Sequence, residues 1–359
     1  MLKKVLSILV LALALILILI LILTSCSHQK DMCFKDIAGS QEEHGEKNEK
    51  RIDNINYSVW TTYWDTEDLE YEIGKIKQNL DQICYFAAYF DQNKRVFIPE
   101  QIYESFKKLR TLYGPEEYKH YLTFVNDLLL EGNQSSLKDM DLLYSLLETK
   151  ESREKHIEEI VYLASKEGFQ GIEIDYEAIN KDFELWELFI EFIDELYTRA
   201  KNNNILLRVI LEPNAPLDRI DLPPGPEYVM MCYNLHGYGN VPGPKANKKF
   251  IEELIRKTEA LPGRVNFALA TGGYDFQENG VVSSLTEREA AELLVLYDQS
   301  PIRDEESRAL VFNYKDPQGV NHEVWYADKE TIDYWIDIIW STTGNDKISL
   351  WKIGGNLTL

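Results

Sequence analysis

Basic residues, cysteines and histidines are scarce in this sequence. Its 359 residues include 38 Lys and Arg against 60 Asp and Glu, so the formal net charge is -22 at pH 7. Binding to a phosphate backbone requires clustered Lys and Arg, and this composition therefore argues against nucleic acid as a partner. The 4 cysteines include no Cys-x-x-Cys pair and give no disulfide framework. Cys84 and Cys232 lie in apolar runs and are predicted to be small buried residues.

The motifs of several enzyme classes are also missing. The sequence has no His-Glu-x-x-His and no pair of histidines at metal-ligand spacing, so no metal site is expected. It has no Gly-rich phosphate loop, because Gly-Gly-Tyr-Asp at 272–275 lies in the wrong context, and it has no Gly-x-Ser-x-Gly. These absences predict a protein that uses neither a metal nor a cofactor.

A nearly unbroken apolar run occupies residues 5–23 and follows Lys3 and Lys4. With Cys26 three residues after its end, this segment resembles a bacterial lipoprotein signal in which Cys26 becomes the lipidated first residue. The alternative is an uncleaved anchor helix, since about 20 apolar residues can span a bilayer. Both alternatives export the rest of the chain, because Lys3 and Lys4 hold the start inside. We therefore expect an extracytoplasmic bacterial protein held at the cell membrane by a lipid.

Three segments follow from this interpretation. Residues 1–25 are the predicted lipoprotein signal peptide, and 26–53 are the lipidated cysteine and a flexible polar linker. Residues 54–359 form the folded part, which we expect to be a monomer.

Strand-like and helix-like patterns alternate through the folded part, which is typical of βαβ units with a parallel sheet. Eight apolar, strand-like runs predict a (β/α)8 TIM barrel, and the rival fold is a doubly wound sheet. These runs are 57–64, 83–90, 120–126, 170–177, 205–212, 228–234, 264–271 and 347–353. The Pro-rich and Gly-rich link between the fifth and sixth runs is not expected to hold a full helix. Two β-prone runs within 309–328 flank Asp-Pro-Gln-Gly, which predicts a β-hairpin inserted before the last helix.

The fourth run carries a row of acids, Glu173, Asp175 and Glu177. Side chains alternate between the two faces of a strand, so all three carboxylates lie on one face. In a barrel they would point inward and rise toward the C-terminal mouth, where barrel enzymes hold their catalytic groups. Because three ionised carboxylates cannot be buried together cheaply, at least one should keep a proton near neutral pH. The alternative is a solvent-exposed face of an edge strand, on which the acids have no chemical role.

The acid row also lies within a recognisable motif. Residues 170–177, Gln-Gly-Ile-Glu-Ile-Asp-Tyr-Glu, resemble the signature Asp-Gly-x-Asp-x-Asp-x-Glu on strand 4 of glycoside hydrolase family 18. Met-Cys-Tyr-Asn at 231–234 is similar to the family's Met-x-Tyr-Asp on strand 6. Trp351 resembles the tryptophan on strand 8 that forms the floor of the central sugar site. The hairpin before the last helix is similar to the spore-cortex branch of the family, which also includes chitinases, endo-β-N-acetylglucosaminidases and lectin-like members without activity.

The resemblance implies a role for each matching residue. Glu177 would be the general acid that protonates the glycosidic oxygen, while Asp175 and Tyr233 would hold the 2-acetamido group of the substrate. Trp351 would stack under the sugar, with Tyr63 and Trp64 as further stacking residues at the end of the first strand. The acetamido oxygen would attack in place of an enzyme nucleophile, the exception among retaining glycosidases. The implied partner is therefore a β-linked glycan containing N-acetylglucosamine, such as peptidoglycan, chitin oligomers or N-glycans.

The sequence departs from the family pattern at four points. These differences put the level of activity in question more than the fold. Gln170 and Glu173 replace two aspartates of the signature, and Asn234 replaces the aspartate after Tyr233. Glu173 is expected to tune Asp175, and Asn234 to contact the substrate or Asp175. The third run also lacks Ser-x-Gly-Gly. A carbohydrate-binding lipoprotein without catalysis on the same barrel therefore stays as the alternative, and a plain scaffold for a protein partner is a third.

Overall fold

The structure, a computed structural model, describes residues 55–359 apart from residues 67, 131, 133 and 240. The predicted signal peptide (1–25), the lipidation site Cys26 and the linker (26–53) lie outside the described residues. Among the helices in the described part of the chain, none has the length and apolar character needed to cross a bilayer.

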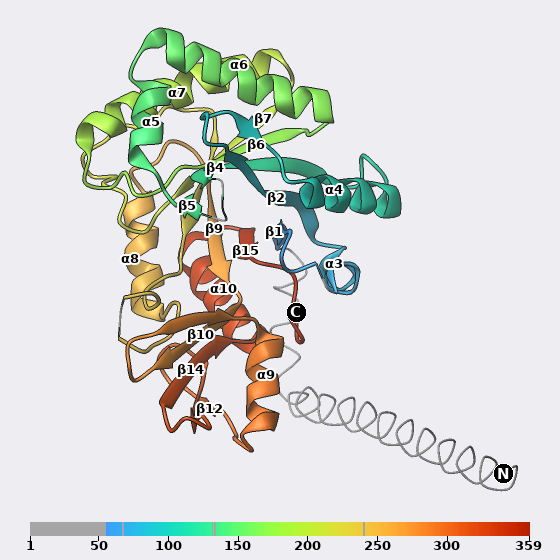
Figure 1. Cartoon of the computed structure of the whole chain (residues 1–359), viewed down its shortest axis with the longest axis vertical. Coiled ribbons are helices and arrows are strands. Elements are labelled where there is room, and N and C mark those ends of the chain that lie inside the picture. Colours follow the sequence, from blue (N-terminus) through green and yellow to red (C-terminus); the bar gives the residue numbers. More distant parts are fainter. Residues whose placement is uncertain (1–54, 67, 131, 133, 240) are drawn as a thin grey trace, which may run out of the picture. The chain divides into compact units, whose positions relative to one another are not determined.

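The central feature is a closed barrel of eight parallel strands (Figure 1). Strand β1 pairs with β15, and β2 pairs with β4, which closes the sheet. The barrel strands are β1 (Asn56–Thr62), β2 (Leu80–Phe90), β4 (Lys119–Leu130), β6 (Gly171–Asp175), β7 (Leu206–Leu211), β8 (Glu227–Met231), β9 (Val265–Ala270) and β15 (Lys347–Trp351). Each of the eight predicted runs forms one of these strands. The (β/α)8 prediction is confirmed, and the doubly wound alternative is excluded because that sheet has open edges.

Helices follow most of the barrel strands and lie around the outside of the barrel (Figure 1). They are α3 (Leu69–Ile76), α4 (Glu100–Tyr113), α5 (Met140–Leu147), α6 (Lys150–Glu167), α7 (Phe183–Asn202), α8 (Lys248–Thr258) and α10 (Lys329–Thr343). Local signals set their ends. Asp182 accepts a hydrogen bond from the backbone N–H of Leu185 and begins α7, whereas Gly168 ends α6 with a φ of 83°. Residues 212–226 contain no helix, as the Pro-rich and Gly-rich link predicted.

The insertion before the last helix is larger than the predicted hairpin. That hairpin is present as β13 (Leu310–Lys315) and β14 (Asn321–Ala327), but it belongs to a five-stranded antiparallel sheet. The other members are β10 (Gly272–Gln277), β11 (Val282–Leu285) and β12 (Ile302–Arg303), and helix α9 (Glu287–Leu296) lies in the same segment. Gly273 permits close pairing of β10 with β14, because a Cβ there would lie 1.8 Å from the backbone oxygen of Trp325. Two short strands, β3 (Val96–Phe97) and β5 (Gln134–Ser136), extend the barrel sheet at β2 and β4.

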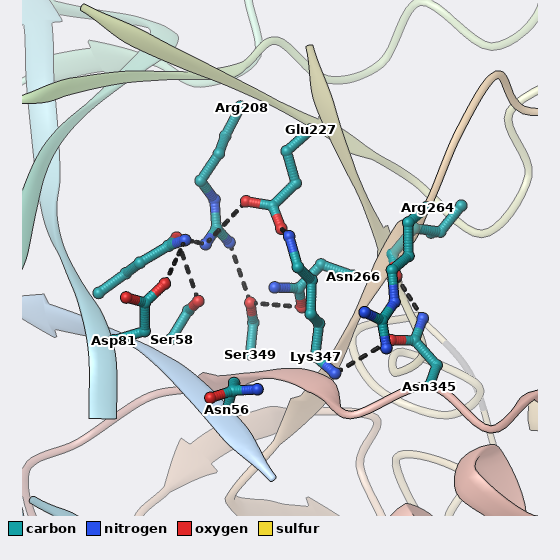
Figure 2. Close-up of polar contacts among 12 residues, drawn as sticks. Asn56, Ser58, Asp81, Arg208, Glu227, Arg264, Asn266, Asn345, Lys347 and Ser349 are labelled. Atoms are coloured by element: carbon teal, nitrogen blue, oxygen red, sulfur yellow. Dashed lines mark hydrogen bonds and ion pairs between the residues drawn. The ribbon is translucent and has the colours of Figure 1, made fainter. Parts of the chain in front are cut away.

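Burial follows the alternation of the strands. Ile172, Ile174 and Tyr176 are buried in the large apolar cluster that also contains helix residues. Their neighbours Glu173 and Asp175 are also buried, but on the inner face of the barrel. The predicted two-faced strand is therefore confirmed, and the exposed edge strand is excluded. The inner face of the barrel also holds buried polar side chains, among them Arg208, Asn266 and Ser349 (Figure 2).

Candidate active site

The fourth barrel strand, β6, carries the acid row from the interior to the mouth. Glu173 and Asp175 lie within the strand, and Glu177 lies two residues beyond its end. Asn126, buried near the mouth end of β4, holds the backbone of Glu177 on both sides. Its Oδ1 accepts from the Glu177 N–H at 2.9 Å, and its Nδ2 donates to the Glu177 carbonyl at 3.1 Å. Glu177 is therefore fixed at the mouth by main-chain contacts that do not involve its carboxylate.

Glu173 lies deepest in the row and is fully buried. Its Oε1 accepts hydrogen bonds from Trp60 Nε1 at 2.5 Å and from Thr123 Oγ1 at 2.7 Å. Its Oε2 forms an ion pair with Arg208 Nε at 2.9 Å. The register of the barrel makes these contacts, because Thr123 on β4 and Arg208 on β7 are both direct neighbours of Glu173. Glu173 therefore has two hydrogen-bond donors at Oε1 and a cation beside Oε2.

Asp175 occupies the middle of the row and is 7% exposed. Burial raises its pKa well above the usual range, and the charges of Glu177 and Glu173 raise the pKa further. Burial and the neighbouring carboxylates therefore favour the protonated form of Asp175. Its Oδ1 is buried and has no hydrogen-bond partner among the described residues, which leaves this atom available to a ligand.

Glu177 lies between a cation and a second carboxyl group. Burial raises the pKa of Glu177 to about 7, and the contact with Glu212 adds to the increase. Lys138 acts in the opposite direction, because its Nζ forms an ion pair with Glu177 Oε2 at 2.5 Å. A pKa near the working pH suits a general acid, which must hold its proton and still release it.

Glu212 is a site residue that sequence reasoning missed. It follows β7, and its Oε2 accepts from the backbone N–H of Ala178 at 2.9 Å and from Asn180 Nδ2 at 2.5 Å. A usable signal existed, because the fifth predicted run ends in this acid just as the fourth ends in Glu177. Lys138 was also missed and had no comparable signal, since it lies in an irregular segment between β5 and α5.

Tyr233 and Asn234 follow β8, but the structure places them differently. Tyr233 is buried at the inner face beside the acid row. Burial and the charges of Asp175 and Glu177 raise the pKa of its phenol, which therefore keeps its proton. Asn234 is exposed, has a φ of 68°, and accepts a long hydrogen bond of 3.4 Å from the hydroxyl of Tyr274. Tyr274 belongs to β10, so the inserted sheet contributes to the mouth.

The predicted stacking residues form one connected aromatic group. Trp351 at the end of β15 lies edge-on to Trp60 and to Phe86, with ring centroids 5.8 and 4.8 Å apart. Phe86 contacts Trp64 at 6.0 Å, and Trp64 contacts Tyr63 at 4.9 Å. Trp64 is 48% exposed, and Trp351 is partly exposed, so two ring surfaces reach solvent. Phe86 is the member that the sequence did not indicate.

Within the described ranges, no group of His, Cys, Asp and Glu side chains is arranged to hold a metal ion. His236, which follows β8, contacts the backbone oxygen of Val241 through Nδ1 at 3.0 Å. What the site offers is a buried acid pair, a phenol and a set of aromatic rings, which together suit a neutral sugar with polar substituents.

Comparison with known proteins covers nearly all of the described chain. The sequence profile described as "Glycosyl hydrolases family 18" matches residues 56–354. The chain belongs to glycoside hydrolase family 18. Within this family it is 27% identical to the "Putative sporulation-specific glycosylase YdhD" of Bacillus subtilis strain 168, over 55% of this chain and 50% of that protein. It is 24% identical to the "Cortical fragment-lytic enzyme" of Bacillus anthracis, over 60% of this chain and 53% of that protein. The family 18 chain thus spans about half the length of these relatives.

Solved structures share the barrel of this family 18 chain. The spore cortex-lytic enzyme SleL of Bacillus cereus superposes with a TM-score of 0.68 at 20% identity, covering 84% of this chain and 71% of that one. A class V chitinase from Pseudomonas fluorescens Pf-5 gives a TM-score of 0.68 at 16% identity, covering 84% of this chain and 96% of that one. At these identities the superpositions establish the fold.

Proposed function

We propose that this family 18 protein hydrolyses β-linked glycans containing N-acetylglucosamine, with retention of configuration and with the substrate's own acetamido group as nucleophile. The observation that carries the proposal is the pair formed by Glu177 and Asp175. Glu177 lies at the mouth with a pKa of about 7, and Asp175 lies beneath it with a raised pKa and an unpartnered Oδ1.

Each group has a place in the proposed reaction. Glu177 gives its proton to the glycosidic oxygen as the bond from C1 to that oxygen breaks. The acetamido oxygen forms a bond to C1 from the other side, which gives an oxazolinium ion. A water then attacks C1 as the bond from C1 to the acetamido oxygen breaks, which restores the acetamido group. The water loses its proton to Glu177, so the acid is restored. Because the attacking oxygen comes from the substrate, the sugar in the central position must carry an N-acetyl group.

Asp175 and Tyr233 are the proposed partners of the acetamido group. The free Oδ1 of Asp175 suits the acetamido N–H, and the protonated phenol of Tyr233 can donate to the acetamido oxygen. Trp351 offers a partly exposed ring on the opposite side of the barrel mouth, against which an apolar sugar face can stack. These contacts would hold the acetamido oxygen close to C1 before reaction, which is how positioning lowers the barrier.

The substrate class within these glycans is narrowed by the relatives rather than by the site. Two relatives are named for spore-cortex glycans or for sporulation and another for chitin, so peptidoglycan and chitin oligomers lead the list. We further propose that the protein acts outside the cytoplasm, anchored through a lipid on Cys26. Support for this location comes from the apolar run and its cysteine in the sequence.

One assay tests the proposal. The full-length protein in detergent and its Glu177→Gln variant are incubated with N-acetylglucosamine oligomers, purified peptidoglycan and a high-mannose glycopeptide, and products are identified by mass spectrometry. We expect cleavage by the wild type alone, with oligomer binding retained in the variant. The bond that is cut names the substrate. Cleavage by both proteins would refute the role of Glu177.

The same assay tests the alternative that the protein binds sugars without cleaving them. The ion pair from Lys138 to Glu177 is the observation in its favour, because it favours the ionised form that cannot act as an acid. Binding of oligomers with no product from any of the three glycans would support this second function and refute the first.

A further inference from the structure

The segment between β8 and α8 brings a lysine to the mouth of the barrel. Lys245 Nζ donates a hydrogen bond to the backbone oxygen of Thr271, just after β9, at 2.8 Å. Thr271 in turn contacts the proposed sugar floor, because its N–H donates to the backbone oxygen of Trp351 at 2.8 Å. The C-terminal ends of the barrel strands meet at the mouth, so the Lys245 ammonium lies at the rim beside Trp351.

Tyr274 connects Lys245 with the catalytic part of the mouth. Lys245 Nζ lies 5.0 Å from the centroid of the Tyr274 ring. Burial raises the pKa of the Tyr274 phenol to about 12, and the charge of Lys138 opposes that increase. Lys138 is the lysine that pairs with Glu177. The ring of Tyr274 therefore contacts Lys245, while its phenol lies within electrostatic reach of the cation beside the proposed general acid.

Lys245 lacks a carboxylate partner, unlike two other lysines at the mouth. Lys138 pairs with Glu177, and Lys352 pairs with Asp65. In the described part of the chain, no Asp or Glu forms an ion pair with Lys245 or offsets the effects of its surroundings. Burial and the nearby charge of Lys352 lower the pKa of the Lys245 ammonium to about 7. A cation withdrawn from water without a counter-ion is costly, and a bound anion would supply the missing partner.

The surroundings of Lys245 suit a sugar that carries the anion. Tyr238 lies in the same segment and is 65% exposed, and its ring is edge-on to that of Tyr274 with centroids 5.4 Å apart. An exposed ring offers an apolar surface on which a sugar face can stack. Asn234 adds an exposed amide, and Lys245 is itself partly exposed. Aromatic surface, amide and unpaired cation thus lie together on one side of the mouth.

We propose that Lys245, with Tyr238 and Tyr274, forms a subsite for a sugar that carries a carboxylate, next to the central N-acetylglucosamine position. The inference rests on the proposed function and deepens it, because it selects among the candidate glycans. Peptidoglycan has the required group, since every second sugar bears a lactyl ether that ends in a carboxylate or in a peptide with carboxylates of its own. Chitin oligomers have no carboxylate. Lys245 is therefore a specificity-determining residue that favours peptidoglycan over chitin.

The overall charge of the chain adds to the importance of this lysine. Acidic residues outnumber basic ones by 60 to 38, and the acid row occupies the centre of the mouth. An acidic glycan is repelled by such a field, so its recognition requires a local cation at the position of its carboxylate.

A binding measurement tests the inference. The full-length wild-type protein in detergent is titrated calorimetrically at about pH 6, where Lys245 is protonated. The ligands are tetrasaccharides of alternating N-acetylglucosamine and N-acetylmuramic acid, joined through sulfur so that they are not cleaved and the pair of Lys138 with Glu177 stays intact. One ligand has free lactyl carboxylates, the second has neutral lactyl amides, and the third has an Ala-Glu dipeptide on each lactyl group.

We expect an acidic ligand to bind about tenfold more tightly than the neutral amide. The tighter of the two acidic ligands identifies whether the recognised carboxylate belongs to the lactyl group or to the peptide. Equal affinity for all three ligands, or failure of both acidic ligands to bind, would overturn the inference.

Variants test whether Lys245 is the cause of the preference. Lys245→Met should remove it while affinity for the amide stays unchanged, and Lys245→Arg should retain it. Lys245→Gln, which can still donate to Thr271, is a second neutral variant and should behave like Lys245→Met. The matched control is Lys248→Met, because Lys248 begins α8 and pairs with Glu252 at 3.2 Å on the exposed helix surface. A preference that survives in both neutral variants, or is lost equally in the control, would refute the role of Lys245.

The binding result is separate from the test of hydrolysis. Failure of the proposed function would appear as absence of product in the cleavage assay, whatever the order of affinities. Failure of the inference would appear as equal affinity for acid and amide, even if the protein cleaves all of its substrates.

Discussion

Replacing Lys138 by methionine should extend the proposed glycosidase activity to higher pH. Lys138 Nζ lies 2.5 Å from Glu177 Oε2, and the two side chains are 46% and 17% exposed. The ion pair stabilises ionised Glu177, so it holds the pKa of this acid below the value that burial alone would give. Methionine keeps most of the length of the lysine stem but removes the charge. The protonated form of Glu177, which is the active form of a general acid, should then persist to higher pH.

The expected shift is moderate because Lys138 is half exposed. Ion pairs at the surface contribute about 0.2–1 kcal/mol, since water screens the attraction. The buried position of Glu177 places this pair near the upper end of that range. One pKa unit corresponds to about 1.4 kcal/mol, so the pKa of Glu177 should rise by about 0.5 to 0.7 unit.

The assay is the pH profile of kcat/KM on a soluble N-acetylglucosamine oligomer. In Lys138→Met the alkaline limb should move to higher pH by the same increment of about 0.5 to 0.7 unit. Lys181→Met is the matched control, because Lys181 lies on the loop after Glu177 but is not among the groups that shift its pKa. A limb that stays in place, or that moves equally in both variants, would refute the assigned effect of Lys138.

Three further predictions address stability, binding and anchoring. The folded-state pKa of Glu177 is about 7, above its ordinary value of 4.5, so its contribution to stability falls as pH rises from about 4.5 to about 7. Glu177→Gln should remove this dependence and raise the free energy of unfolding at about pH 8 by about 3 kcal/mol, measured by urea denaturation; an unchanged or lower value would contradict the pKa assignment. Trp351→Phe keeps the contact with Phe86 but offers less ring area to a sugar, so KM should rise about tenfold, or about 1.4 kcal/mol, with a smaller change in kcat. If the effect falls on kcat alone, Trp351 is not a binding surface. Finally, mass spectrometry of the protein from bacterial membranes should find a diacylglyceryl group on Cys26, and an unmodified chain that begins at Met1 would favour the uncleaved anchor.

The barrel was predictable because its signals are local. Eight apolar runs separated by helical patterns specify βαβ units, and period-two alternation in 170–177 assigns each residue to a face before any contact is known. The inserted sheet was only partly predictable. Asp-Pro-Gln-Gly marked the hairpin of β13 and β14, but β10 is short, begins with two glycines and pairs with a strand far along the chain.

For the acid row, too, the sequence predicted some properties, whereas others depend on the tertiary structure. The sequence predicted that Glu173, Asp175 and Glu177 share one face and that one of them keeps a proton, and it showed the resemblance to family 18. It could not establish which acid keeps the proton, because a pKa depends on burial and on charges that arrive from other strands. Only the closed barrel brings Arg208 of β7 beside Glu173, and only the loops bring Lys138 and Glu212 to Glu177. Alternation along one strand is a property of the local backbone, whereas the electrostatic environment of each carboxylate depends on which strands become neighbours.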